Sequence, residues 1–199
     1  MTDYAIRRAR PDDRAALSDI CLRTADSGGD ATALYSDPAY PGLIWAEPYL
    51  EFDPEFAFVL EADGVVVGYV IAAHDTGEFE AQLAANWWPA LRQKYEDREP
   101  DALHDRRVLS LIAEPPQTPV ERLTDYPAHL HIDLLPQAQG QGWGRKLIET
   151  LLAALKDADV RGVHLGVGAT NTNALGFYER LGFAEIGRNG AIWMGKRLD

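Results

Sequence analysis

The sequence is poor in cysteine, in cationic residues and in long apolar runs. Cys21 is the only cysteine among 199 residues, which excludes an intramolecular disulfide bond and a zinc site built from several cysteines. The 19 lysines and arginines stand against 31 aspartates and glutamates, so the net charge is −12. A nucleic-acid-binding protein needs clustered cations to neutralise phosphates, and we therefore expect no nucleic-acid partner.

The sequence also lacks the hydrophobic segments that target or anchor a protein to a membrane. No stretch reaches the roughly 18 consecutive apolar residues that span a bilayer. The first residues, Met-Thr-Asp-Tyr-Ala-Ile-Arg, lack the apolar core of a signal peptide. We expect a cytoplasmic protein with no membrane partner, in which Cys21 lies in the core on the apolar face of a helix rather than acting as a nucleophile.

What the chain does contain is the composition of a soluble globular protein, with 46% hydrophobic and 25% charged residues. Its length suits one domain with one main core. It has no internal repeat and no low-complexity tract, and strand-like and helix-like segments alternate along it. We therefore predict a single mixed α/β domain over residues 1–199.

The periodicity of apolar residues predicts the order of the elements. In the N-terminal half we expect a strand at 4–8, a helix starting at 11–13, an ordered loop with at most one short helix at 27–54, a hairpin of strands at 56–61 and 65–72, a helix over 78–95 interrupted by a proline, and a short helix at 108–112. In the C-terminal half we expect a strand at 129–135, a long helix after a glycine-rich turn, a strand at 163–167, a helix at 174–181, and strands near 183–186 and 192–194.

Residues 129–135 form a strand whose polar side chains share one face. Polar and apolar residues alternate there, and successive side chains of a strand point to opposite faces. His129, His131 and Asp133 therefore lie together, and three titratable groups are unusual on one face of a buried strand. This face is a candidate catalytic surface.

A glycine-rich turn follows this strand and opens a helix. Gly140, Gly142 and Gly144 alternate along it. Free N–H groups at a helix N-terminus attract an anion, and glycines let that anion approach the backbone. The spacing does not match a nucleotide-triphosphate loop or a dinucleotide fingerprint. It indicates a pyrophosphate site, with a merely tight strand-to-helix turn as the alternative.

Two motifs in the C-terminal third resemble those of the GNAT (N-acetyltransferase) superfamily. Residues 134–144, Leu-Leu-Pro-Gln-Ala-Gln-Gly-Gln-Gly-Trp-Gly, resemble its Gln/Arg-x-x-Gly-x-Gly/Ala signature. Residues 171–183 resemble its downstream Asn-x-x-Ala-x-x-x-Tyr-x-x-x-Gly-Phe element. Looser similarity at 37–38, 48–50, 58–61, 68–69, 75–76 and 87–89 resembles the acetyltransferase-like C-terminal domain of O-GlcNAcases, of which the chain looks like a free-standing bacterial-type homologue.

The resemblance implies a GNAT fold, a central mixed and mostly antiparallel sheet flanked by helices, and acetyl-CoA as the cosubstrate. Backbone N–H groups in the turn would hold the pyrophosphate, and two leucines would pair with the pantetheine arm like an added strand. Of two candidate asparagines near that arm, the spacing of the motif favours Asn171. The implied cofactor-binding residues are Leu134, Leu135, Gln139, Gly140, Gln141, Gly142, Trp143, Gly144, Arg145, Asn171 and Asn173. An asparagine that opens a helix is otherwise a cap.

The resemblance also implies catalytic residues for direct transfer of the acetyl group to an amine. Tyr178 resembles the tyrosine that acts as general acid, although a core aromatic residue is the alternative. The general base is expected among Asp133, His131 and His129, in that order. No metal is expected, and zinc bound by these side chains is the minor alternative.

The acceptor is expected opposite the cofactor, over the N-terminal loop and the hairpin. It is an unidentified amine on a small molecule or a protein, and a catalytically silent acetyl-CoA-binding scaffold or sensor is the alternative function. Aromatic residues in the 35–50 segment are expected to be exposed, as a lid or a homodimer contact. The residues expected to line the acceptor site are Asp30, Asp37, Tyr40, Tyr49, Asp75 and Tyr126.

Overall fold

The structure, a computed structural model, describes residues 2–198. Its strands are β1 (Tyr4–Arg8), β2 (Ala57–Ala62), β3 (Val65–Ala73), β4 (Ala128–Leu134), β5 (Gly162–Val167), β6 (Ala184–Arg188) and β7 (Ile192–Arg197). Its helices are α1 (Arg14–Leu22), α2 (Tyr40–Trp45), α3 (Glu47–Phe52), α4 (Thr76–Asn86), α5 (Trp88–Tyr95), α6 (Asp105–Ala113), α7 (Val120–Asp125), α8 (Trp143–Asp157) and α9 (Thr172–Arg180). Single 3₁₀ turns occur at Pro11–Asp13, Thr32–Leu34, Pro54–Phe56 and Pro136–Ala138.

The seven strands form one sheet in the order β1-β2-β3-β4-β5-β7-β6. Every neighbouring pair is antiparallel except β4 and β5, which run parallel. This confirms the predicted mixed, mostly antiparallel sheet. The strands β2 and β3 form the hairpin predicted at the Asp-Gly turn, in which Asp63 and Gly64 both have positive φ.

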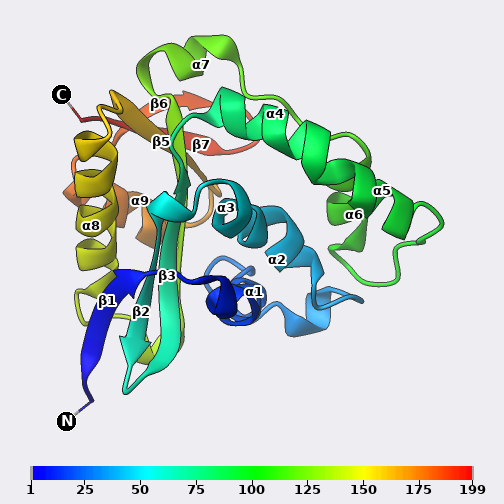
Figure 1. Ribbon diagram of the computed structural model, residues 1–199, viewed down its shortest axis with the longest axis horizontal. Helices are drawn as coiled ribbons and strands as arrows, with labels where there is room; N and C mark the ends of the chain where they lie inside the picture. The colour runs from blue at the N-terminus through cyan, green and yellow to red at the C-terminus, as the bar shows by residue number, and fades with distance from the viewer. Residues whose placement is uncertain (1, 199) are drawn as a thin grey trace.

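Helices cover both faces of the sheet and build two hydrophobic cores. On one face lies α8, whose stripe of Leu147, Ile148, Leu151 and Leu155 is completely buried (Figure 1). The opposite face packs against α1, α2 and α3. The side chains of β3 alternate between the two cores, so both faces of that strand are apolar and buried.

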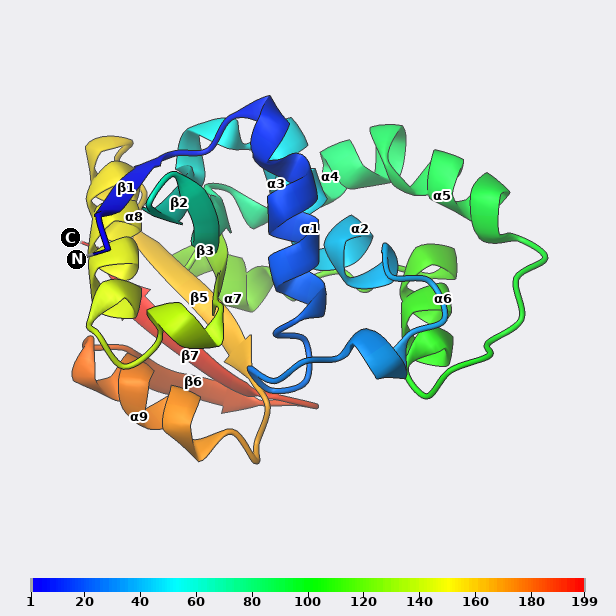
Figure 2. The ribbon, with the colours of Figure 1, turned by 90° about the horizontal axis from the view of Figure 1, so that it is seen from below.

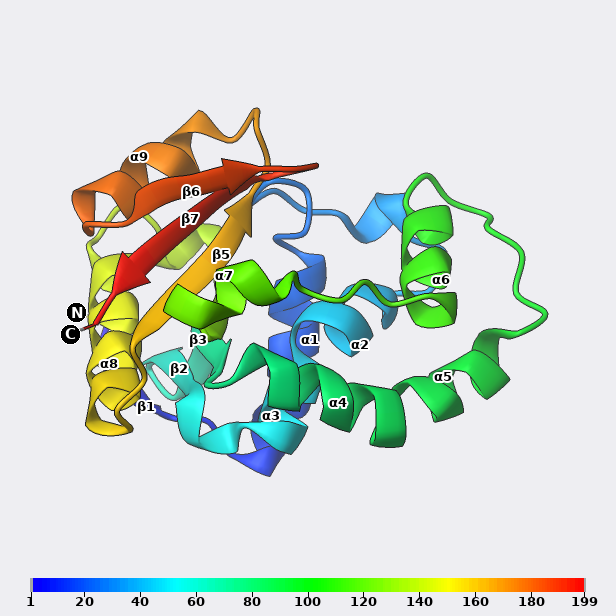
Figure 3. The same ribbon diagram turned by 90° about the horizontal axis from the view of Figure 1, so that it is seen from above.

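The helices α4, α5 and α6 form an arm that extends away from the sheet beyond α2 (Figures 2 and 3). The helix predicted over 78–95 is two helices, which meet at Trp87, and Pro89 occupies the first turn of α5. A proline is tolerated in that first turn because its missing N–H has no intrahelical acceptor there. The interruption expected at the proline is confirmed.

The prediction for residues 27–54 was wrong in two respects. The segment holds two helices, α2 and α3, rather than at most one, and each is only six residues long. Such a helix is too short to show a clear periodicity. The aromatic residues Tyr35, Tyr40 and Tyr49 are buried in the core beneath α1, so they are not an exposed lid or dimer contact.

Cys21 and the lengths of the helices bear on two further expectations. Cys21 is buried, as expected, and burial raises the pKa of its thiol. Between residues 2 and 198, no helix has the length and apolarity needed to cross a bilayer.

Candidate active site

The site lies where β4 and β5 separate. These two strands are paired at Ala128 with Val163 and at His129 with His164, and at no later position of the described chain. The other edge of β4 stays paired with β3, where the N–H of Leu135 donates to Val67. Because hydrogen bonding alternates along an antiparallel pair, the N–H groups of Ile132 and Leu134 and the C=O of Ile132 point into the gap, whereas the C=O of Leu134 already accepts from Nε2 of Gln139 at 2.8 Å. One strand edge is thus open for an extended ligand.

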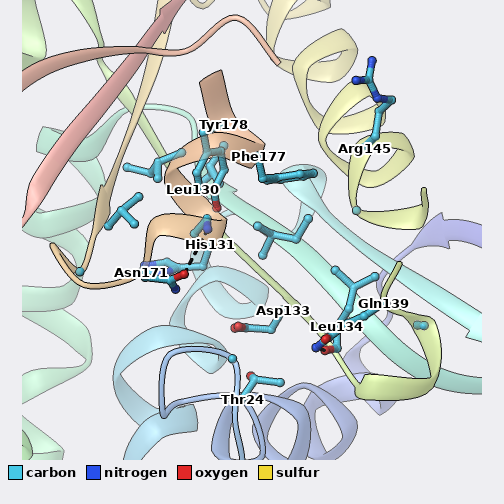
Figure 4. Close-up of a pocket in the computed structure, with 18 of the residues that line it drawn as sticks. Thr24, Leu130, His131, Asp133, Leu134, Gln139, Arg145, Asn171, Phe177 and Tyr178 are labelled. Atoms are coloured by element: carbon cyan, nitrogen blue, oxygen red, sulfur yellow. Dashed lines mark hydrogen bonds between the residues drawn. The ribbon is translucent and has the colours of Figure 1, made fainter. Parts of the chain in front are cut away.

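A first cavity of about 620 Å³ fills this gap. It extends from β4 and the end of β5 to the glycine-rich turn, the start of α8 and the inner face of α9. Figure 4 shows side chains from these elements around it, including Asp133, Asn171 and Tyr178. A volume of this size is typical of a small-molecule site.

The glycine-rich turn ends in the uncapped N-terminus of α8. Gly140 and Gly142 have φ values of 72° and 83°, which favour glycine because a Cβ is strained there. Lys146 makes the first helical hydrogen bond, to Gly142, and no side chain caps the helix. The N–H groups of the first three helical residues, 143–145, therefore lack intrahelical acceptors, and such groups bind anions.

The structure brings most of the predicted cofactor residues to this cavity. Its lining includes Leu134, Gln139, Gly140, Gly142, Gly144, Arg145 and Asn171. Asn171 also caps α9, since its Oδ1 accepts from the N–H of Ala174. Its position therefore fits a helix cap as well as a residue beside the cofactor.

Four predicted residues do not line the first cavity. Leu135 is buried and its N–H is already bonded to Val67, so it cannot pair with a ligand as Leu134 can. Asn173 is an exposed residue in the first turn of α9. The side chain of Gln141 donates to Gln137, and the ring of Trp143 stacks on Tyr4; only the backbone groups of these last two residues were predicted to bind.

Tyr178 and Asp133 face the first cavity from opposite elements. Tyr178 lies on α9 against Phe183, and its hydroxyl has no hydrogen-bond partner among the described residues. Burial and the nearby carboxylate of Asp133 raise the pKa of Tyr178. The carboxylate of Asp133 accepts from the hydroxyl of Tyr69 at 2.5 Å, while burial raises the pKa of Asp133 to about 6.

His129, on the same face of β4 as Asp133, is held between two hydroxyl groups. Thr76 uses its single hydroxyl proton to donate to the carbonyl of Pro127 at 2.6 Å, so its oxygen accepts from Nδ1 of His129 at 2.8 Å. The remaining nitrogen, Nε2, accepts from the hydroxyl of Tyr49 at 2.7 Å. Burial and the neighbouring imidazoles lower the pKa of His129 well below its usual value, so it is a neutral, fixed group.

His131 lies at a junction between two cavities. A second cavity of about 530 Å³ opens between the arm and the face of β4 and β5 that carries His129 and His164. Both cavities are lined by Leu130, His131, Leu165 and Gly166. Burial and nearby His164 lower the pKa of His131 to about 4. The imidazole makes no hydrogen bond within residues 2–198 and is therefore available to a ligand.

Of the residues expected at the acceptor site, Tyr49 alone lines the second cavity. Tyr40 is fully buried, Asp37 accepts from the hydroxyl of Tyr95, and Asp75 caps α4. Asp30 accepts from Thr32 on the surface, and the ring of Tyr126 covers Gly195. Which loop residues pack inward depends on long-range contacts, and the loop sequence alone does not show it.

Several lining residues were not predicted. Thr24 and Gly28 reach the first cavity from the segment after α1, and Phe177 and Arg180 reach it from α9. Phe177 and Arg180 could have been found, since they neighbour Tyr178 on one helix. In the described chain, no group of three or more histidine, cysteine or acidic side chains is arranged to hold a metal ion.

Known proteins resemble this chain along most of its length. The model of the acetyltransferase (GNAT) family matches residues 27–183. The protein O-GlcNAcase of Rattus norvegicus is 26% identical over 188 residues, which are 93% of this chain and 20% of that protein. The chain therefore spans about a fifth of the length of the curated relatives it matches.

Solved structures resemble it as well. The crystal structure of SsHAT matches with a TM-score of 0.89 and 42% identity, covering 99% of both chains. The structure of yncA from Salmonella typhimurium, solved with its cofactor acetyl-CoA, matches with a TM-score of 0.56 and 17% identity over 98% of this chain and 94% of that one. At this lower identity the likeness shows the fold alone.

Proposed function

The chain belongs to the acetyltransferase (GNAT) family, and we propose that it transfers the acetyl group of acetyl-CoA to a primary amine by direct attack. The observation that carries this proposal is the meeting of two cavities at His131. One cavity has the donor groups that a coenzyme A thioester needs, and the other reaches the same point from the side of the helical arm. Two reactants can therefore meet without a covalent enzyme intermediate.

The groups in the first cavity fit acetyl-CoA. The free N–H groups at residues 143–145 suit its pyrophosphate, and the exposed guanidinium groups of Arg145 and Arg180 add positive charge nearby. The open edge of β4, which presents both backbone groups of Ile132 and the N–H of Leu134, suits the amides of the pantetheine arm. Such local donors explain how a protein of net charge −12 can bind an anion.

The chain's own side chains can move the protons of the reaction. Acetyl-CoA supplies the acetyl group as a thioester. A backbone N–H on the open edge of β4 polarises the carbonyl, the imidazole of His131 takes the proton of the attacking amine, and the hydroxyl of Tyr178 gives a proton to the departing sulfur. A C–N bond replaces a C–S bond, and the net transfer is one proton from nitrogen to sulfur.

We favour His131 over Asp133 as the base for a geometric reason. His131 lines both cavities, whereas Asp133 lines the first cavity alone and its carboxylate is already engaged by Tyr69. His129 is engaged at both ring nitrogens. The geometry of a general base is the first criterion, and its pKa the second.

The first experiment is calorimetric titration of acetyl-CoA into the wild-type protein, Gly142→Trp and Gly142→Ala. No heavy atom lies within 4 Å of a Cβ built at Gly142, so the alanine variant shares the strain of the positive φ without filling the anion site. We expect wild type and Gly142→Ala to bind and Gly142→Trp not to bind, with circular dichroism showing that all three are folded. A wild-type protein that does not bind acetyl-CoA would overturn the proposal.

A transfer assay then separates binding from catalysis. Release of free CoA is measured against a panel of primary amines, with the Gly142→Trp variant as the background. Binding without release of CoA for any amine would leave a cofactor-binding protein and refute the transferase.

A further inference from the structure

We propose that Tyr4 is a positioning residue for the cofactor, because it holds the glycine-rich turn in the conformation that receives a pyrophosphate. This inference rests on the proposed function and concerns how its anion site is built. Tyr4 belongs to β1, at the other end of the chain from the turn. The described lining of the first cavity includes neither Tyr4 nor Trp143, so Tyr4 acts through the turn rather than by touching the ligand.

The glycine-rich turn has few hydrogen bonds of its own. Between residues 2 and 198, the backbone N–H groups of residues 140–145 make no hydrogen bond to another backbone group, and no side chain caps α8. Gly140 and Gly142 add conformational freedom, since glycine has the least restricted backbone. N–H groups left unpaired for an anion cannot also hold the turn together. Contacts made by side chains therefore fix its conformation.

Tyr4 supplies such contacts at both ends of the turn. Its ring stacks on the ring of Trp143, with the two centroids 5.0 Å apart and the planes inclined by 28°. Its hydroxyl donates to the carbonyl of Gln137 at 3.3 Å, and the same carbonyl accepts from the side-chain amide of Gln141 at 2.7 Å. Gln137 precedes the glycines and Trp143 follows them. Figure 1 shows β1 beside the start of α8.

The partners of this contact are themselves held in place. β1 is paired with β2 along its length, and Arg7 of β1 forms an ion pair with Glu61 of β2. The indole of Trp143 has a second partner, because the ammonium of Lys146 lies 3.9 Å from its ring centroid. A tyrosine on a fixed strand can thus pre-organise the turn, so that acetyl-CoA does not have to order it on binding.

Calorimetric titration of acetyl-CoA into Tyr4→Ala and Tyr4→Phe tests the inference. Tyr4→Ala loses the stacked ring, and we expect its Kd to rise by about tenfold, which matches the energy of a stacked aromatic pair. Tyr4→Phe keeps the ring and loses only a long hydrogen bond, so its Kd should stay within about threefold of wild type. In a transfer assay, Tyr4→Ala should raise KM for acetyl-CoA and leave kcat unchanged.

Ile6→Ala is the matched control. Ile6 lies two residues further along the same face of β1 and packs on the same core as Tyr4, so its loss tests general loosening of the strand. We expect this variant to bind acetyl-CoA as wild type does. Equal affinity of Tyr4→Ala and wild type, or equal weakening by Tyr4→Ala and Ile6→Ala, would overturn the inference and leave the proposed function intact. A wild-type protein that does not bind acetyl-CoA would overturn both.

Hydrogen exchange measures the turn without any ligand. The amides of residues 136–146 should exchange faster in Tyr4→Ala than in wild type, because the turn opens locally. The amides of β5 should exchange at the wild-type rate in the same variant. Unchanged exchange in the turn, or equal acceleration in the turn and in β5, would contradict a positioning role.

A double-mutant cycle with Trp143 decides the route of the effect. Trp143→Leu removes the same stack from the other partner, so it should weaken binding about as much as Tyr4→Ala does, and it replaces that variant if Tyr4→Ala does not fold. Residues that act as one unit are not additive. The double variant should therefore bind about as weakly as either single variant, and a Kd raised by the product of the two single effects would show that Tyr4 does not act through Trp143.

Discussion

The hydroxyl of Tyr49 lies 2.7 Å from Nε2 of His129 and donates a hydrogen bond to it. The donor role follows from the other ring nitrogen, because Thr76 can only accept from Nδ1. This pair forms part of the inner wall of the second cavity. It fixes one neutral tautomer of a histidine that stands two residues before His131 on the same face of β4.

Replacing Tyr49 with phenylalanine should destabilise the protein, because the lone pair on Nε2 of His129 loses its donor. We expect the free energy of unfolding to fall by about 1–2 kcal/mol, measured by urea denaturation. Thr76→Ser keeps the hydroxyl that accepts from Nδ1 and should be less destabilising. Equal stability of Tyr49→Phe and wild type would show that this hydrogen bond contributes nothing net.

Replacing Tyr178 with phenylalanine should slow catalysis without weakening the cofactor complex. The variant lacks the hydroxyl that we propose as the proton donor to the departing sulfur, and we expect kcat to fall about 100-fold or more. Calorimetry provides the control, since the Kd for acetyl-CoA should stay within about threefold because the hydroxyl makes little ground-state contact. An unchanged kcat would return Tyr178 to the role of a core aromatic residue.

The dependence of kcat/KM on pH distinguishes the two candidate bases, provided that rates are expressed per unprotonated amine. Protonation of the base as the pH falls abolishes its function. If His131 is the base, activity should persist down to about pH 4. If Asp133 is the base, it should fall below about pH 6. We expect the first result, with a large loss of kcat in His131→Gln and a smaller one in Asp133→Asn.

The buried tyrosines of the arm interface provide a matched pair for stability. The hydroxyl of Tyr40 is the only buried side-chain polar atom of residues 2–198 without a hydrogen-bond partner, whereas the hydroxyl of Tyr95, whose ring packs on Tyr40, donates to Asp37 at 2.9 Å. Tyr40→Phe should therefore leave stability equal or raise it by about 1 kcal/mol. Tyr95→Phe should lower it by a similar amount. Thermal unfolding should show the opposite signs, and a destabilised Tyr40→Phe would show that the nearby guanidinium of Arg98 stabilises this hydroxyl.

The histidine cluster should make the protein sensitive to acid. In the unfolded chain imidazoles take up protons near pH 6.5, but the folded protein keeps His131 and His164 neutral down to about pH 4. Unfolding therefore binds protons between these values, and stability falls as the pH decreases from about 6.5 to 4, by up to about 1.4 kcal/mol per pH unit for each imidazole. Asp133 acts in the opposite direction, because its raised pKa lets the folded state bind a proton first.

Urea unfolding at pH 7 and pH 5 measures this dependence. His164→Asn should lose less stability than wild type over that interval, because one imidazole no longer titrates on unfolding. An equal loss in the variant and in wild type would place the acid sensitivity elsewhere.

Local features of the site could be predicted from the sequence because each depends on neighbouring residues. The period of two in β4 placed His129, His131 and Asp133 on one face, and the positive φ values of Gly140 and Gly142 agree with a turn that only glycine adopts easily. Asn171, seven residues before Tyr178, was the asparagine that reached the cavity. The spacing of the superfamily motif had favoured Asn171 over Asn173, which does not line the cavity.

The sequence by itself determined the sheet-forming segments, the glycine-rich turn and the identity of the titratable face, because periodicity and backbone restraints act over a few residues. Only the tertiary structure decided that β4 and β5, more than 25 residues apart in the chain, pair at two positions and then diverge. It likewise decided that Tyr49 packs inward against His129 while Asp30 stays on the surface. Such long-range packing leaves no periodic signal, and it is what brings two cavities together at His131.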